Sequence, residues 1–185
     1  MIDYDKLKFE IPEGVKYPES YVEGKRTERR FLDYCENNGF IVRKAETYND
    51  IYQHFDFYVK NKNGVEVRID VKSEKKLNRW DAKTNKEIQW LELKGVKGHE
   101  GWLYGKAHYI AFKYGTVFII AKTKDLLELT LKLRKLDSNG KPIICTSDDK
   151  KMYETLQRDD RKDEVVLVKT DDIKTLKYDV LKWVI

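Results

Sequence analysis

The stretch from residue 54 to residue 73 reads HFDFYVKNKNGVEVRIDVKS, and each half alternates between apolar and polar residues. A period of two is typical of β-strands that bury one face. Between the halves, Lys62-Asn63-Gly64 fits a three-residue hairpin loop with glycine in the left-handed position. The stretch therefore predicts two antiparallel strands, 54–61 and 65–73.

The length of this loop determines which residues of the two strands face each other. The predicted apolar pairs are Val59–Val67, Phe57–Ile69 and Phe55–Val71. A shift of one residue would set apolar against polar side chains along the whole hairpin. The same register places Asp56 opposite Asp70 and His54 opposite Lys72.

The pairing of Asp56 with Asp70 is the unusual feature of this hairpin. Like charges directly opposite each other, with Cβ atoms ~5 Å apart, destabilise a sheet. Such carboxylates share a proton or bind a cation, and hard oxygen ligands suit Mg²⁺ or Mn²⁺. Lys72 lies two residues beyond Asp70, on the same face of the strand. A carboxylate-bound metal beside a lysine is an arrangement that supports phosphodiester hydrolysis. The alternative is that both aspartates are solvated residues, paired with His54 and Arg68.

Asp56 followed by Asp70-Val71-Lys72 resembles the signature of the PD-(D/E)XK nuclease superfamily. That superfamily includes restriction endonucleases, Holliday-junction resolvases and many phage and repair nucleases. The resemblance implies catalysis by Asp56, Asp70 and Lys72, with Mg²⁺ (or Mn²⁺) held by the two aspartates. It also implies Glu28 as a further metal ligand and catalytic residue, although Glu28 could instead interact with a helix dipole. The chain departs from the pattern at Phe55, where proline is usual, and at Asp70, where glutamate is more frequent.

The fold that this resemblance implies is an α/β (α+β) protein with a restriction-endonuclease-like αβββαβ core. A mixed central sheet flanked by helices would be followed by a C-terminal β/α extension. An amphipathic helix over 26–38, with Thr27 as its N-cap, and a strand over 40–43 agree with this order. We expect an N-terminal arm (1–24), a nuclease-like core (25–136) and an extension (137–185) packed on the same domain.

Hydrophobic periodicity and turn residues predict the remaining elements. The expected elements are strands at 88–93, 109–113, 116–121, 143–146, 152–157 and 165–169, a helix at 124–136, and a short helix or turn at 171–177. A glycine-rich loop over 95–106 separates the first two of these strands. Glu92 and Gln89 are left open as accessory groups at the edge of the site. Glu92-Leu93-Lys94 is a rival [D/E]-x-K triplet, but it lacks an upstream hairpin aspartate.

Basic and aromatic residues follow the predicted site in two segments. The candidates for nucleic-acid contact are Lys75, Lys76, Arg79, Lys97, Tyr104 and Lys106. Flexible basic and aromatic segments suit a nucleic-acid backbone. A solvated turn is an equally good explanation for the first three, and we expect Trp102, in the same loop, to pack in the core.

The composition is compatible with this interpretation. The 185 residues include 37 basic and 32 acidic ones, for a net charge of +5, which weakly favours a polyanionic partner. Cys35 and Cys145 lack metal-site spacing, which argues against a zinc site. We find neither a signal peptide nor a membrane-spanning stretch, so we expect a cytoplasmic protein without a membrane partner.

The leading hypothesis is a Mg²⁺-dependent (endo)deoxyribonuclease of the PD-(D/E)XK type that acts on DNA. Many relatives implied by the resemblance act as dimers, so a homodimer is one of the expected assemblies. The first alternative is a catalytically silent DNA-binding or accessory module on the same fold. The second is a protein that does not bind nucleic acid and whose carboxylate pair is incidental. The substrate form is left open among duplex, single strand, flap, junction and specific site.

Overall fold

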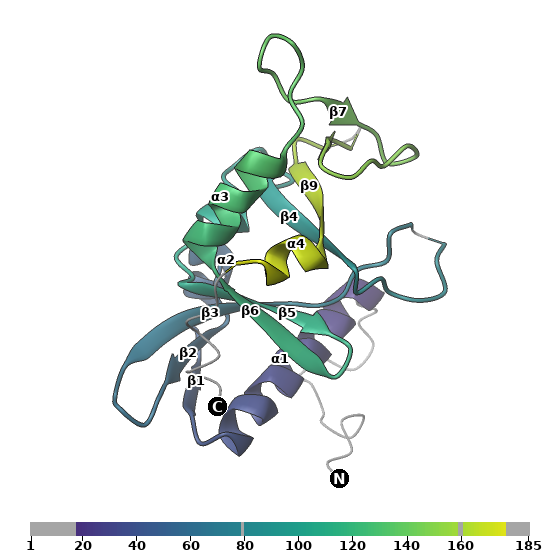
Figure 1. Cartoon of the computed structure of the whole chain (residues 1–185). Helices are drawn as coiled ribbons and strands as arrows, with labels where there is room; N and C mark the ends of the chain where they lie inside the picture. The colour runs from purple at the N-terminus through teal and green to yellow at the C-terminus, as the bar shows by residue number, and fades with distance from the viewer. Residues whose placement is uncertain (1–17, 79, 159–160, 177–185) are drawn as a thin grey trace.

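The computed structural model describes residues 18–78, 80–158 and 161–176 (Figure 1). The helices of this part are α1 (Glu19–Asn37), α2 (Thr47–Gln53), α3 (Thr123–Leu133), α4 (Thr170–Lys174) and the 3₁₀ turn η1 (Trp102–Tyr104). The strands are β1 (Ile41–Lys44), β2 (Phe57–Lys60), β3 (Glu66–Lys72), β4 (Ile88–Lys94), β5 (Tyr109–Tyr114), β6 (Val117–Lys122), β7 (Ile144–Cys145), β8 (Thr155–Leu156) and β9 (Glu164–Lys169). None of the helices in these ranges is both long and apolar enough to cross a bilayer.

The strands form two mixed sheets. The larger sheet has the order β1-β2-β3-β5-β6, in which only β3 and β5 run parallel. The smaller sheet has the order β4-β9-β8-β7, with β7 and β8 parallel. The predicted mixed α/β class is therefore confirmed. Beyond residue 136, β9 pairs with β4 along its whole length.

Helix α1 covers one face of the larger sheet (Figure 1). Phe31 and Cys35 project from the helix onto apolar side chains of the sheet. The buried residues of this layer on the sheet are Phe57, Val59, Val67, Ile69, Val71, Ala111 and Ile120. Phe31 is fully buried, so α1 is fixed against the strands that carry the candidate site.

The other face of the larger sheet is covered by α3, α4 and the smaller sheet. Its core contains Phe55, Leu91, Leu93, Trp102, Leu103, Ile110, Phe112, Leu126, Val166, Val168 and Ile173, among others. Trp102 is 8% exposed and packs edge-on against Phe112, which confirms its predicted place in the core. The strands β3 and β5 are thus covered on both faces, as parallel pairs usually are.

The predicted hairpin register is confirmed along its distal part. The ladder between β2 and β3 pairs Phe57 with Ile69, Tyr58 with Arg68, Val59 with Val67 and Lys60 with Glu66. The loop closes through the N–H of Gly64, which has a φ of 83° and donates to the carbonyl of Asn61. Glycine adopts this left-handed conformation without the steric cost that a side chain would bring.

The proximal end of the hairpin was predicted wrongly, because residues 54–56 precede β2. Helix α2, which the sequence did not predict, ends at Gln53, and the left-handed φ of 54° at its C-cap His54 turns the chain. The strand therefore begins only at Phe57. Phe55 packs in the cluster with α3 and does not face Val71, which lies under α1. The expected ladder pairs at residues 54, 55 and 56 do not form.

The N-terminal boundaries also differ from those predicted. Helix α1 begins at Glu19, and therefore takes up residues that were expected to belong to an arm over 1–24. Thr27 is buried in the middle of the helix and is not its N-cap. Residues 1–17 lie outside the described part of the chain.

The element order matches the expected αβββαβ only in its first half. After α1, β1, β2 and β3, with α2 inserted, the chain continues through β4 and η1 before reaching β5. A strand and a 3₁₀ turn thus make the crossover between the parallel strands β3 and β5, where the expected order has a helix. Helix α3 follows β6 instead.

Candidate active site

Asp56 is bound to the end of β3 by its own polar groups. Its N–H donates to the carbonyl of Ile69 at 2.9 Å, and its Oδ2 accepts the N–H of Val71 at 2.7 Å. Its carbonyl accepts the N–H of Ala45 at 2.7 Å. Asp56 is 7% exposed. The carboxylate of Asp56 therefore accepts the N–H of Val71, next to Asp70, in place of a backbone carbonyl. The prediction had instead placed Asp56 in a regular ladder pair opposite Asp70.

Asp70 and Lys72 form a close ion pair on β3. Lys72 Nζ lies 2.6 Å from Asp70 Oδ2, and Asp70 is 4% exposed. Burial, the largest influence, raises the pKa of Asp70, which Lys72 acts to lower and Asp56 to raise. The net result is a pKa of about 8. Two neighbouring carboxyls and one ammonium thus interact within a buried site.

Glu28 reaches the same group from α1. Its carboxylate accepts two hydrogen bonds from Lys25 Nζ, at 2.7 and 2.9 Å. Burial and then the charge of Asp56 raise the pKa of Glu28, against the lowering effect of Lys25. The structure therefore brings Glu28 into electrostatic contact with Asp56, as well as into an ion pair with Lys25. Sequence reasoning missed Lys25, because the predicted helix began at residue 26; in the observed α1, Lys25 lies three residues before Glu28 on the same helix.

Lys72 is surrounded by groups from the crossover between β3 and β5. Its Nζ lies 4.8 Å from the centre of the Trp102 ring, a distance that permits a cation–π contact. Burial acts to lower the pKa of Lys72, but the carboxylates of Asp70, Asp56 and Glu92 outweigh it and raise the pKa. The neighbouring carboxylates therefore favour the charged form of Lys72.

Of the two residues left open by the sequence, only Glu92 lies beside the site. Its carboxylate interacts with Lys72 and accepts the backbone N–H of Trp102, although burial raises its pKa overall. Gln89 is buried elsewhere, where its amide donates to Thr170 Oγ1 at 3.1 Å. Both side chains lie on β4, and only the packing of this strand could distinguish them.

The donor set of Asp56 and Asp70 suits a hard divalent cation. Mg²⁺ is usually held by one or two carboxylates, with waters and substrate phosphates completing its coordination. Within the described ranges, no three His, Cys, Asp or Glu side chains converge enough to hold a metal ion. The two aspartates would thus be the protein ligands, and Glu28 would be recruited only by movement of its side chain away from Lys25.

The residues predicted to contact nucleic acid lie in separate places. Lys75 and Lys76 follow β3, and Lys76 Nζ pairs with Glu19 at 3.1 Å. Arg79 lies outside the described residues. Three further exposed residues belong to the segment that leads from β4 to β5: Lys97, Tyr104 and Lys106. The structure brings none of these lysines into an ion pair with Asp56 or Asp70.

Comparison of the chain with protein-family models, curated proteins and solved structures gives no match in any of the three. The functional interpretation therefore depends on the geometry of the site itself.

Proposed function

We propose that this protein is a metal-dependent nuclease that hydrolyses phosphodiester bonds of DNA, built on a restriction-endonuclease-like core. One observation carries the proposal. Two adjacent buried carboxyls, Asp56 and Asp70, share their site with the ammonium of Lys72, which lies 2.6 Å from Asp70. Burying charges is costly, so such a cluster is more often retained for function than for stability.

Asp56 and Asp70 would hold the cation, which would activate a water molecule and neutralise phosphoryl oxygens. Asp56 is kept in place by the N–H of Val71, and Asp70 by Lys72. As an ammonium, Lys72 would donate a hydrogen bond to the phosphate or to the attacking water.

The decisive experiment is a cleavage panel of labelled DNA forms with Mg²⁺, Mn²⁺ or EDTA. The panel comprises single strand, blunt duplex, flap and four-way junction. We expect cleavage with either metal and none in EDTA. Asp70→Asn and Lys72→Met should each lower the cleavage rate about 100-fold or more, because each removes a group that stabilises charge in the transition state.

Glu66→Gln is the matched control, since Glu66 is an exposed carboxylate on the same strand. Its cleavage rate should equal that of the wild type. Cleavage that persists in EDTA, or that survives both site substitutions, would overturn the proposal. Salt-sensitive DNA binding without cleavage under any metal would instead identify a silent binding module.

A further inference from the structure

A cleft of about 590 Å³ opens beside the candidate site (Figure 1 shows the elements around it). One wall is the N-terminal half of α1, and the other is the segment that follows β3, from Ser73 to Lys76 and from Ala82 to Thr84. Ser73 comes directly after Lys72. The cleft is therefore continuous along the chain with the end of the strand that carries Asp70.

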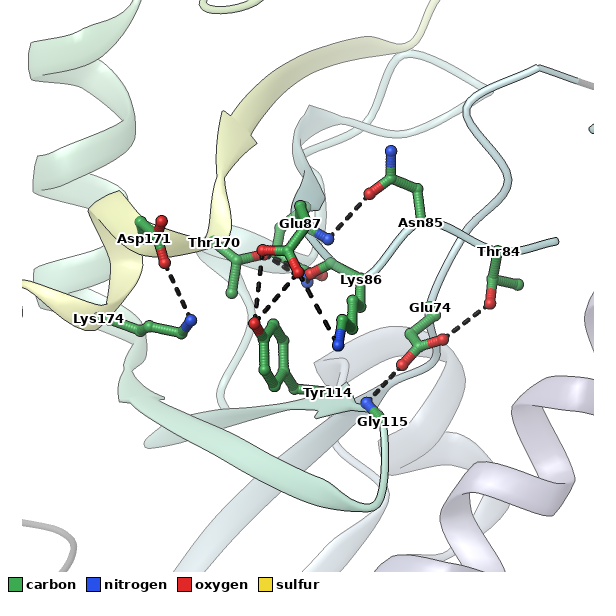
Figure 2. Close-up of polar contacts among 11 residues, drawn as sticks. Glu74, Thr84, Asn85, Lys86, Glu87, Tyr114, Gly115, Thr170, Asp171 and Lys174 are labelled. Carbon is green, nitrogen blue, oxygen red and sulfur yellow. Dashed lines mark hydrogen bonds and ion pairs between the residues drawn. The ribbon is translucent and has the colours of Figure 1, made fainter.

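The acidic side chains of the cleft are already bound to partners. Glu19 pairs with Lys76 at 3.1 Å, and Glu23 pairs with Lys113 at 2.7 Å. Both oxygens of Glu74 accept hydrogen bonds of 2.7 Å, one from the Thr84 hydroxyl and one from the N–H of Gly115 (Figure 2). These contacts hold the walls together. Lys76 and Lys113 offset the charges of Glu19 and Glu23, whereas Glu74 is bound by neutral donors.

Two lysines that line the cleft, Lys75 and Lys83, take part in none of these pairs. Lys75 and Lys83 are exposed there and take part in no ion pair within the part of the chain that the structure describes, and Arg26 also lines the cleft. Desolvation and the nearby charge of Lys72 lower the pKa of Lys75. An anion bound beside Lys75 would offset its repulsion from Lys72.

The lysines on the other side of this segment are held differently. Lys86 Nζ and Lys174 Nζ lie 4.9 and 4.2 Å from the centre of the Tyr114 ring. The Tyr114 hydroxyl donates to Glu87 at 3.2 Å, and Figure 2 shows this group around the tip of the β5–β6 hairpin. These cations are used in tying the β5–β6 hairpin to α4, whereas Lys75 and Lys83 line the cleft.

We propose that this cleft binds the phosphate backbone of one nucleic-acid strand, with Lys75 and Lys83 contacting successive phosphates. Its volume is that of a small-molecule pocket, which admits a few nucleotides of one strand but not both strands of a duplex. The inference rests on the proposed function only for the choice of nucleic acid as the anion. In this proposal, the nucleic-acid strand runs through the cleft next to the phosphodiester bond that is cut.

The test is the binding of a labelled 12-nucleotide oligo-dT, measured by fluorescence anisotropy in EDTA over a series of salt concentrations. Lys75→Ala/Lys83→Ala should weaken binding about tenfold and reduce the salt slope by ~1.4, because each lost phosphate contact on a single strand contributes ~0.7. Lys132→Ala/Lys141→Ala is the matched control, since it removes the same charge from exposed positions outside the cleft. The control should retain at least half of the wild-type affinity.

Equal losses in the two double variants would overturn the inference, because net charge alone would then explain binding. If Lys75→Ala/Lys83→Ala weakened binding of a blunt duplex, used as a second probe, but not of oligo-dT, the inference would be overturned as well. Because EDTA prevents metal-dependent cleavage, the two proposals fail separately. Cleavage by wild-type protein with unchanged binding by Lys75→Ala/Lys83→Ala would reject only the cleft. Weakened binding by this variant, with no cleavage by wild-type protein, would reject only the nuclease.

Discussion

At the scale of single residues, Lys72 has close contacts with an acidic and an aromatic side chain. It is held from one side by Asp70 at 2.6 Å and from another by the ring of Trp102, whose centre lies at 4.8 Å. A desolvated cation–π contact is worth up to ~2 kcal/mol. The ring is buried and packed against Phe112, and these contacts hold it beside the ammonium. Trp102 is therefore expected to position Lys72.

Replacing Trp102 separates this role from simple packing. Trp102→Phe keeps an aromatic face under the ammonium, whereas Trp102→Leu fills much of the space without one. We expect the leucine variant to cleave DNA about tenfold more slowly than the phenylalanine variant, as the loss of ~1.4 kcal/mol predicts. The measurement is kcat and KM for both variants, and the difference should lie in kcat. Equal rates for the two folded variants would show that the ring does not position the lysine.

At the scale of elements, the segment between β4 and η1 folds back on β4. The N–H of Gly101 donates to the carbonyl of Leu93 at 3.0 Å, and this contact brings Trp102 beside Glu92. A Cβ at Gly101 would lie 2.4 Å from the carbonyl oxygen of Glu92. Only glycine permits so close an approach of the two backbones.

Gly101→Ala should therefore destabilise the protein by about 2 kcal/mol, because backbone atoms of β4 must move to make room. Gly24→Ala is the matched comparison within α1. A Cβ at Gly24 meets no atom within 4 Å, so this change should stabilise the protein by about 0.5–1 kcal/mol through helix propensity. Urea unfolding measures both values. Equal stabilities for the two variants would contradict the close approach at Gly101.

At the scale of the whole molecule, His108 links the crossover to the larger sheet. Its Nε2 lies 2.8 Å from Nη2 of Arg68, and its Nδ1 accepts the backbone N–H of Arg68 at 3.2 Å. Burial and then the charge of Arg68 lower the pKa of His108. The neutral ring has one nitrogen that can accept from Arg68, and protonation would remove this acceptor, so the folded protein favours the neutral ring.

This shift predicts how stability changes with pH. The unfolded chain takes up the proton first, near its ordinary pKa of about 6.5, while folded His108 takes it up only at lower pH. The stabilisation by neutral His108 is thus present above about pH 6.5 and lost as the pH falls further. His108→Gln should show a smaller loss of unfolding free energy between pH 7.5 and 5 than wild type. Parallel urea-unfolding curves for the two proteins over this range would contradict it.

The candidate site could be predicted from sequence only where local pattern controls geometry. The alternation of β2 and β3 and the Asn63-Gly64 turn set the register of the hairpin. Asp70 and Lys72 are two residues apart on one strand, so their side chains lie on the same face and meet. Glu28 could be predicted because helical periodicity places its side chain on the same side of the helix as Phe31. These relations involve neighbours in the chain, for which propensity and turn length are sufficient.

Other features of the molecule were decided by tertiary packing. Helix α2 and the left-handed His54 removed Asp56 from the ladder, and its carboxylate instead bonds the backbone of Val71. Likewise, Glu92 reached Lys72 only because β4 pairs with β9 outside the larger sheet. The cleft depends on contacts such as that between Glu19 and Lys76, far apart in the chain. Such contacts depend on the packing of whole elements against each other, so no local pattern in the sequence specifies them.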